Sequence, residues 1–424
     1  MSAQSMDQRD RPTGYLPEGA DINRNIAARR LRGAIWQAIF VSSLIIGLLA
    51  LATLIYTIVD ETFGYIAVQT KIDPEELEEL TDGRPLEELS KEELIEILRA
   101  NVSAGLFRRF DRDEPFSERS KESVLQLVEE RVVGREVVAA YKLTESLLER
   151  ERIEATVRER FPRAKLEFHS WINREFLTRP MSSVPLLAGV GNAILGSLWV
   201  IAITMLLAIP IGILGGVYLE EYASDTWYYR LIETNINNLA GVPSIIYGIL
   251  GLAVFVRALE ALTSGAMFGV TDSNGRTILS AGLTMALLVL PLMIINAREA
   301  IRAVPQSLRQ ASYGLGATKW QTVWHHVLPN ALPGILTGTI LSVSRAMGET
   351  APLIVIGAST FVVFFPDSVF DKFTVIPIQI YNWTSQPGAQ FRSIAAAAII
   401  VLLVTLLALN ATAILLRNRL RRNY

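Results

Sequence analysis

The sequence predicts an all-α polytopic membrane protein with six transmembrane helices and one helical insert outside the membrane. Residues 60–185 hold 28 acidic and 20 basic residues and carry a net charge of −8, whereas the other 298 residues hold 14 acidic and 20 basic residues. That remainder is 11% charged, far below the roughly 25% of soluble domains. Its apolar residues form long unbroken runs. The chain therefore combines a membrane core with a soluble insert.

Five charge-free runs are long enough to cross a bilayer core, which needs about 20 apolar residues in a helix. They cover residues 33–59, 181–219, 234–256, 277–297 and 393–416. The first span is expected at 34–59 and, because its run is longer than a signal-peptide core, as a retained anchor. The second run contains Pro185 and Pro210, so its span is expected from residue 191. A sixth apolar region, 332–365, is interrupted only by Arg345 and Glu349.

The charges flanking the spans predict their orientation. Four arginines lie just before the first span and four just after the last: Arg24, Arg29, Arg30 and Arg32, then Arg417, Arg419, Arg421 and Arg422. By the positive-inside rule the tails 1–33 and 417–424 are cytoplasmic, which an even number of spans requires. The basic segment 298–330 is expected inside as well. The loop 220–233, which this orientation also places inside, is acidic and does not fit the rule, although acidic residues contribute little to it.

The insert, residues 60–185, is then expected to face the outside. Helices are predicted to begin at Asp73-Pro74 and at Ser90, where Ser90 and Glu93 form a capping box. Apolar residues at three-and-four spacing predict amphipathic helices. They are Leu94, Ile97 and Leu98, then Val124, Leu127 and Val128, then Val137 and Tyr141. The insert is either a solvated helical domain or a docking surface for an extracellular partner, and the sequence leaves both open.

Composition narrows the chemistry that the chain can perform. It has no cysteine and only three histidines, His169, His325 and His326. A thiolate-held zinc or iron–sulfur site is thereby excluded, and the histidines lack the spacing of an HExxH metal motif. No GxxxxGK[ST] phosphate loop occurs, so ATP hydrolysis is expected in a separate chain. We expect no metal and no cofactor in this chain.

The segment between the fourth and fifth spans predicts two short helices on the cytoplasmic face. Pro305 is suited to the first turn of one helix, and Gly316 supplies a permissive backbone between the two. Pro329 is expected to close the second helix before the next span. Such a helix pair beneath a bundle is suited to transmit force from a cytoplasmic partner, although an ordinary loop has the same composition.

The same segment resembles the EAA loop of importer-type ABC permeases. The matching residues are Gln310, Ala311 and Ser312, then Gly316, then His326, Leu328 and Pro329. Gln310, Ser312 and His326 depart from the Glu, Ala and Ile of that pattern. Downstream, the run from Ser344 to Leu353 resembles the signature of the A-type permease of phosphate transport systems. This resemblance covers about residues 187–416 and the first span, but not the large insert. It implies a type I importer fold over residues 186–416, with residues 298–330 as the segment that couples to the ATPase.

The charged pair within the sixth apolar region is the candidate substrate site. Charge inside a bilayer is costly, so an intramembrane ionisable pair is a functional hypothesis by default. Arg345 and Glu349 lie four residues apart, which predicts one helix face. The Arg345 guanidinium would donate bidentate hydrogen bonds to phosphate oxygens, and Glu349 would either hold the guanidinium in place or accept a proton from the phosphate. Mutual neutralisation as packing is the alternative. Arg298 is a candidate exit contact or a positive-inside anchor.

These features predict the permease subunit of an importer of inorganic phosphate in the cytoplasmic membrane of a bacterium or archaeon. The resemblance implies three protein partners: a homologous second permease, an ABC ATPase dimer that binds the ATP, and an external phosphate-binding protein. Membrane lipid is expected around the spans, and nucleic acid is not expected as a partner. Glycine repeats at Gly212–Gly216 and Gly334–Gly338 are expected to face the second permease. The alternatives are a permease for another oxyanion, a membrane-anchored receptor, and an ion-coupled secondary transporter.

Overall fold

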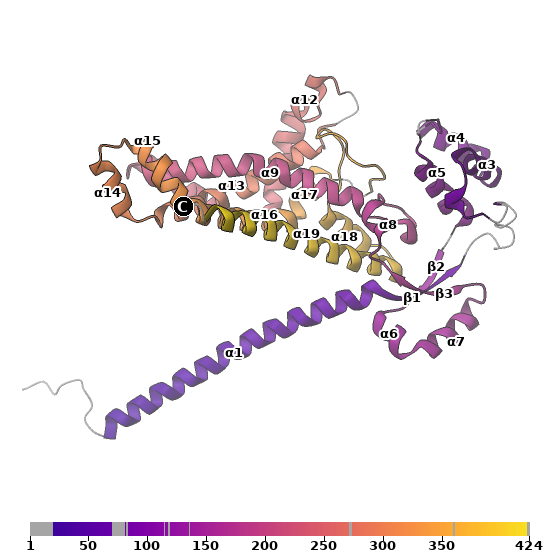
Figure 1. Ribbon diagram of the computed structural model, residues 1–424, viewed down its shortest axis with the longest axis horizontal. Coiled ribbons are helices and arrows are strands. Elements are labelled where there is room, and N and C mark those ends of the chain that lie inside the picture. Colours follow the sequence, from indigo (N-terminus) through magenta and orange to yellow (C-terminus); the bar gives the residue numbers. More distant parts are fainter. Residues whose placement is uncertain are drawn as a thin grey trace, which may run out of the picture. The chain divides into compact units, whose positions relative to one another are not determined.

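The computed structural model describes residues 20–69, 81, 84–113, 115–117, 119–134, 136–270, 274–358 and 361–421. It divides into two units, residues 1–57 and residues 58–424. The first unit contains most of helix α1 (Ala20–Thr62), which is long and apolar enough to cross a membrane. The second unit contains the remaining spans and the insert (Figure 1).

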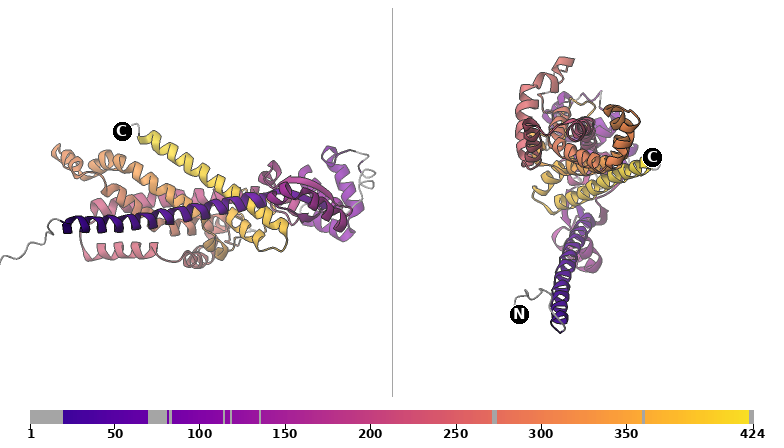
Figure 2. Two further views of the ribbon diagram at one scale, coloured as in Figure 1. Left: turned by 90° about the horizontal axis from the view of Figure 1, so that it is seen from below. Right: turned by 90° about the vertical axis from the view of Figure 1, so that its left-hand side faces the viewer.

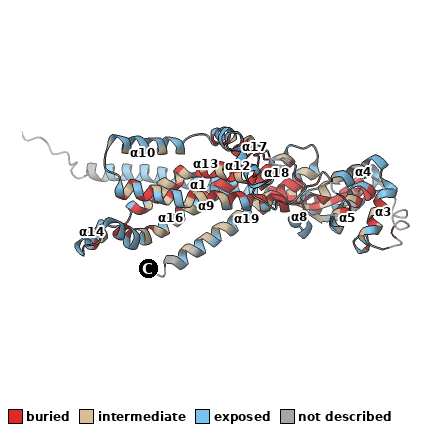
Figure 3. Ribbon diagram, turned by 90° about the horizontal axis from the view of Figure 1, so that it is seen from above, coloured by how far each residue is buried: buried red, intermediate tan, exposed pale blue. Residues whose placement is uncertain are grey.

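Four long helices make up the body of the second unit. They are α9 (Gly191–Val217), α13 (Ile278–Arg302), α16 (Leu328–Gly348) and α19 (Ala389–Arg421). Helix α13 is the central one, because it packs against both α9 and α16, and α16 in turn packs against α19. In Figure 3 buried residues are frequent in the region of α9 and α13. Each of these four helices is long and apolar enough to cross a membrane, alone or with the helical turn that adjoins it, as the sequence predicts.

Both glycine repeats pack against α13. A methyl group added at Gly212 would lie 2.7 Å from Met293 Cβ, and one at Gly216 would lie 2.8 Å from Ala297 Cβ. Likewise, Gly334 approaches Ala300 and Gly338 approaches Asn296. The expectation that these repeats face a second permease is therefore wrong. Small residues permit two helix backbones to approach each other closely. Here the glycines of α9 and α16 permit both helices to pack closely against α13.

The third predicted span, residues 234–256, is broken. Helix α10 (Trp227–Ala240) ends at Gly241, and α11 (Ser244–Gly251) continues through the π-helical segment η6 (Leu252–Ala258). The two parts meet at 103°. Pro243 explains the break, because its missing N–H and its ring are incompatible with an uninterrupted helix. The residues described include five helices that qualify as spans, or six if the bent pair counts as one.

Three short α-helices, α12 (Glu260–Thr263), α17 (Ala351–Ile356) and α18 (Ile376–Thr384), and two 3-10 turns, η4 (Pro185–Leu187) before α9 and η7 (Ala266–Phe268), also belong to the membrane part. The helix predicted from the sixth apolar region, 332–365, stops at Gly348 instead of crossing the whole region. A continuous helix would require the N–H that Pro352 lacks, so a new helix, α17, begins instead with that proline in its first turn.

The insert contains a sheet that the prediction of a wholly helical domain missed. Strands β1 (Phe63–Gln69), β2 (Glu136–Ala140) and β3 (Lys165–Ser170) form an antiparallel sheet in the order β2-β1-β3. Ile66 lies opposite Ala140 on one side and Glu167 on the other. Val137 thus belongs to a strand, not to a helix. Its three-and-four spacing to Tyr141 was misleading, because strand burial follows a period of two.

The sheet attaches the insert to the ends of the membrane helices. Ile66, Val68 and Val137 share one hydrophobic core with Trp383 of α18 and Ile394 of α19. Helices α6 (Leu143–Leu148), α7 (Arg150–Arg160) and α8 (Arg174–Thr178) accompany the sheet. The insert is therefore packed onto the bundle by long-range apolar contacts, which no local sequence pattern reports.

A helical part of the insert has its own core. It is formed by η2 (Leu86–Glu88), α3 (Lys91–Asn101), α4 (Ala104–Asp113), α5 (Lys121–Val128) and the π-helical η3 (Glu129–Val133). Leu94, Leu98 and Val124 are fully buried in it, as their spacing predicts. The predicted capping box is confirmed, since Ser90 accepts from the Glu93 N–H and Glu93 accepts from the Ser90 N–H. The helix start predicted at Asp73-Pro74 lies outside the described residues.

The capping box makes α3 sensitive to acid. The Ser90 N–H and then the Arg84 guanidinium stabilise the Glu93 carboxylate and lower its pKa from 4.5 to about 2. Because the pKa is lower in the folded helix, this contribution is complete above pH 4.5 and is lost as the pH falls towards about 2. Hydrogen exchange of residues 91–101, corrected for intrinsic rates, should show protection falling over this range. Glu93→Gln should remove the pH dependence, and equal pH dependence in both proteins would contradict the explanation.

Candidate functional site: the charged helix break and the coupling segment

Residues 298–330, here called the coupling segment for the role that the resemblance implies, contain two short helices joined by a tight turn. Helix α14 (Gln306–Gly314) begins after Pro305, and α15 (Lys319–Thr322) begins after Thr318, whose side chain caps it. Gly316 has φ +83°, a left-handed conformation that favours glycine. The hydroxyls of Ser312 and Thr322 lie 2.8 Å apart and are buried, so they join the two helices. The geometry agrees with the predicted helix pair.

The end of the coupling segment differs from the prediction. Helix α15 continues through the π-helical turn η8 (Val323–Val327) into α16, which Leu328 begins. Pro329 therefore lies in the first turn of α16 and does not close a separate helix. The wider π-helical turn offers a physical reason, because it alters the hydrogen-bond ladder where the proline has no N–H to donate. His326, which replaces Ile in the resemblance, is exposed.

The coupling segment presents an exposed apolar surface, here called the aromatic patch. It consists of Tyr313, Leu315, Trp320 and Trp324, which are 41%, 90%, 55% and 55% exposed. The rings of Trp320 and Trp324 stack with centroids 5.4 Å apart. Gln310 and Ala311 are also exposed, whereas Ser312 is buried. Large exposed apolar side chains that gather on one segment are typical of interaction sites, and Figure 2 shows α14 and α15 at one end of the bundle.

The charged pair lies where α16 breaks. Arg345 is in the last turn of α16, and Glu349 follows the helix with an extended backbone, ψ 121°. The sequence predicted both residues on one helix face, but Glu349 lies beyond the end of the helix. Arg345 Nε nevertheless lies 3.5 Å from Glu349 Oε1. Their side chains are 41% and 21% exposed, so the guanidinium keeps accessible donors.

Close packing fixes the segment that follows the pair. A methyl group at Gly248 of α11 would lie 2.7 Å from Pro352 Cα in α17. Helix α17 lies directly against α11 at this point, so only glycine fits there. Glu349 therefore lies between the end of α16 and a helix, α17, that is packed against α11.

Arg298 is placed differently from Arg345. Its guanidinium donates to Glu220 at 3.1 Å, to Glu233 and to the Tyr229 hydroxyl at 2.7 Å, and its side chain is only 16% exposed. All three donor nitrogens are therefore engaged. An oxyanion that bound Arg298 would have to replace one of its carboxylate partners. The ion pairs of Arg298 with Glu220 and Glu233 also explain why the loop 220–233 is acidic, against the positive-inside pattern.

A buried ion pair that the sequence analysis missed lies beside Arg298. Glu221 and Arg309 have side chains that are each 6% exposed, and Arg309 Nη2 lies 2.7 Å from Glu221 Oε1. The acidic pair Glu220-Glu221 was a visible signal, but nothing in the sequence indicates which arginine each carboxylate meets. The pair joins the coupling segment to the end of α9.

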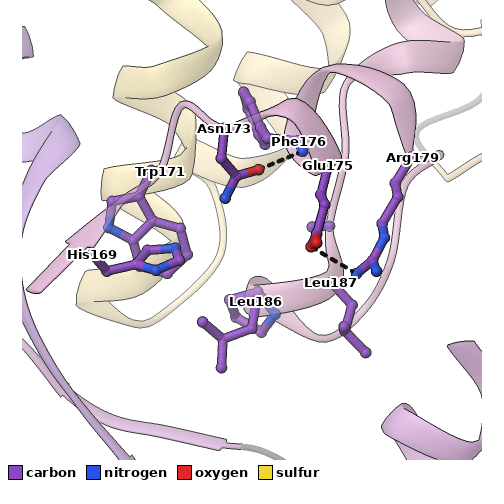
Figure 4. Close-up of a pocket in the computed structure, with 10 residues that line it drawn as sticks. His169, Trp171, Asn173, Glu175, Phe176, Arg179, Leu186 and Leu187 are labelled. Carbon is purple, nitrogen blue, oxygen red and sulfur yellow. Dashed lines mark hydrogen bonds and ion pairs between the residues drawn. The ribbon is translucent and has the colours of Figure 1, made fainter. Parts of the chain in front are cut away.

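The only histidine in the insert lines a small pocket between β3, α8 and η4. Figure 4 shows His169 beside Trp171, with Asn173 accepting from the Phe176 N–H and Glu175 near Arg179. The cavity of about 10 Å³ admits a single water molecule. Within the described ranges, no group of three His, Asp or Glu residues is placed to hold a metal ion.

The fold and site define a polytopic helical membrane protein with a surface helix pair at one end and an ion pair at a helix break. Residues 208–422 match the family model described as binding-protein-dependent transport system inner membrane component. The chain belongs to this family of transport permeases, so it is a transporter subunit and not an enzyme.

Three relatives show how similar the chain is to known permeases. It is 32% identical over 258 residues to the probable ABC transporter permease protein YqgI of Bacillus subtilis, covering 58% of this chain and 83% of that protein. It is 33% identical to the phosphate transport system permease protein PstA 1 of Mycobacterium tuberculosis, covering 54% and 70%. It is 30% identical to the phosphate transport system permease protein PstC of Pasteurella multocida, covering 53% and 73%.

Proposed function

We propose that the chain is a permease subunit of an ATP-driven importer that carries inorganic phosphate across the cytoplasmic membrane of a bacterium or archaeon. The observation that carries the proposal is the pair Arg345–Glu349, whose guanidinium is partly exposed at a helix break within the membrane part. The names of the PstA and PstC relatives support phosphate as the substrate. A half-exposed guanidinium suits a transported oxyanion, because its fork matches two oxygens while the nearby carboxylate limits the strength of binding.

The coupling segment and Arg298 take separate roles in this proposal. The aromatic patch and Gln310, Ala311 and Gly316 would contact an ABC ATPase dimer, which binds the ATP. The ion-paired state of Arg298 favours a structural role over an exit contact, since two carboxylates already neutralise it. The assembly would also include a homologous second permease and an external phosphate-binding protein. Both tails, 1–33 and 417–424, and the segment 298–330 would lie in the cytoplasm, and the insert 60–185 outside.

Reconstitution tests the proposal directly. The chain, its second permease and a tagged ATPase subunit are co-expressed, purified and placed in proteoliposomes with the phosphate-binding protein. We expect co-purification, ATP hydrolysis that rises with phosphate, and phosphate uptake that sulfate does not inhibit. Inhibition by sulfate would favour a permease for another oxyanion. Failure to co-purify with any ABC ATPase would instead favour the receptor or the secondary transporter.

A further inference from the structure

The strongest feature outside the proposed substrate site is the acidic pair at the end of α9. Glu220 and Glu221 lie in the π-helical turn η5 (Tyr218–Tyr222), which extends α9. Although adjacent in sequence, the two carboxylates meet arginines from different helices: Glu220 meets Arg298 of α13, and Glu221 meets Arg309 of α14. The single turn η5 thus contacts both α13 and α14 through ion pairs.

The contact with α14 is strongly directional. Arg309 donates to Glu221 Oε1 from Nε at 2.9 Å and from Nη2 at 2.7 Å. The same guanidinium donates to the carbonyl of Ile301 at 2.9 Å and to that of Val304, at the C-terminal end of α13. Three donor nitrogens therefore join the coupling helix to both α9 and α13. A cation at a helix C-terminus is also favoured by the exposed carbonyls and the helix dipole.

The contact through Glu220 extends this group to a fourth helix. Arg298, which Glu220 accepts from, also donates to Glu233 and to the Tyr229 hydroxyl on α10. Helices α9, α10, α13 and α14 consequently share one polar cluster, built on η5. Helix α10 precedes the 103° bend into α11, and α11 packs against α17 beside the Arg345–Glu349 pair.

Burial separates this cluster from ordinary surface ion pairs. Val217, Ile301, Val304 and Val323 belong to one hydrophobic core, and Arg309 donates to the carbonyls of two of its members, Ile301 and Val304. A buried ion pair adds little net stability compared with apolar side chains of similar size. Unlike apolar contacts, which are non-directional, it fixes one relative position of the partners. Its clearest physical consequence is the register of α14 against α9 and α13.

We propose that Arg309 and Glu221 are positioning residues that make the coupling helix α14 move as one body with α9 and α13. The proposal rests on the proposed function, in which α14 receives the motion of the ATPase. A displacement of α14 is then passed to α9 and α13 without slippage, and through Arg298 to α10 and the bent segment. Without the pair, α14 keeps its contact with α15 through Ser312 and Thr322, but only apolar contacts hold it against α9 and α13, so it can shift while the spans stay in place.

The test compares transport with ATP hydrolysis in the reconstituted complex. Arg309→Met alone leaves Glu221 buried without its partner, which endangers folding. The double variant Arg309→Met, Glu221→Met keeps an apolar contact and should assemble. We expect it to hydrolyse ATP while the phosphate taken up per ATP falls about tenfold, within the usual range of coupling between sites. The matched control is Arg302→Met, because Arg302 is 61% exposed and lies 3.8 Å from Glu220. It should keep the wild-type ratio.

A parallel fall in uptake and hydrolysis, with an unchanged ratio, would overturn the proposal and leave the pair a purely structural role. A second measurement is independent of the substrate. The chain has no cysteine, so spin labels can be attached to introduced cysteines at Gln306 of α14 and Leu214 of α9, both exposed. We expect their separation to stay constant on ATP binding in the otherwise wild-type complex and to change in the double methionine variant. A constant separation in both would also overturn the proposal.

The same experiments distinguish failure of the link from failure of the proposed function. If the wild-type complex hydrolyses ATP but takes up no phosphate, the substrate assignment fails and the label distances still decide the role of the pair. If the wild-type complex transports phosphate and the double variant keeps the same ratio, only the link is wrong.

Discussion

Replacing Arg345 with Gln is expected to abolish phosphate uptake while the subunits still assemble and bind ATP. The guanidinium would contribute two charge-assisted hydrogen bonds to a passing oxyanion, and loss of about 3 kcal/mol corresponds to about 100-fold in uptake rate. Since the Arg345 side chain is 41% exposed, its replacement leaves no large cavity and should not impair folding. Initial uptake of labelled phosphate into proteoliposomes, at matched amounts of complex, measures the effect.

Two further variants identify the role of each member of the pair. Glu349→Gln should reduce uptake less than Arg345→Gln, because the guanidinium remains but is no longer held at 3.5 Å from a carboxylate. Arg392→Gln serves as the control, because Arg392 is another exposed arginine, in the first turns of α19. It should leave uptake unchanged. Undiminished uptake by Arg345→Gln would exclude the residue from the substrate path and leave the pair as mutual neutralisation.

Loss of the aromatic patch is expected to separate the permease from its ATPase. Leu315→Asp and Trp320→Asp each place a charge on an apolar surface that is 90% or 55% exposed in the chain alone. Central apolar contacts of an interface contribute at least about 2 kcal/mol each, so each change should weaken association about 30-fold or more. The measurement is recovery of the chain with a tagged ATPase subunit.

The control for this experiment uses an equally exposed leucine elsewhere. Leu148 of α6 is 83% exposed but belongs to the insert, so Leu148→Asp should leave association intact. Deleting residues 310–316 should remove association altogether, because it also removes the turn that Gly316 provides. Retention of the ATPase by the deletion variant, with transport preserved, would show that coupling takes place elsewhere.

The spans and the coupling segment were predictable because their causes are local. A run of about 20 apolar residues favours a membrane helix, although the run 234–256 is broken at Pro243, and the capping box at Ser90 follows from residues three positions apart. The conformation of Gly316 likewise follows from its own missing side chain. These features required no knowledge of neighbours in space.

Where prediction failed, the deciding contact was distant in sequence. Val137 was assigned to a helix because its strand partner, Val68, lies far away along the chain. The glycine repeats were assigned to a partner subunit, although Gly212 meets Met293 within the same chain. Proline positions were visible in the sequence, but whether they stop a helix depends on how the next segment packs. Pro329 and Pro352 both lie in the first turn of a helix, but α16 continues directly from η8, whereas α17 begins after the break at Glu349.

The sequence by itself determined a membrane core with a charged insert, the position of the coupling segment and the choice of Arg345 and Glu349 as a pair. Only the tertiary structure decided that Arg298 is held by Glu220 and Glu233, and that Arg309 is buried with Glu221. The physical reason is that hydrophobicity and capping act over one or two helical turns. Ion pairing depends on distance through space, and Glu221 and Arg309 are 88 residues apart in the chain.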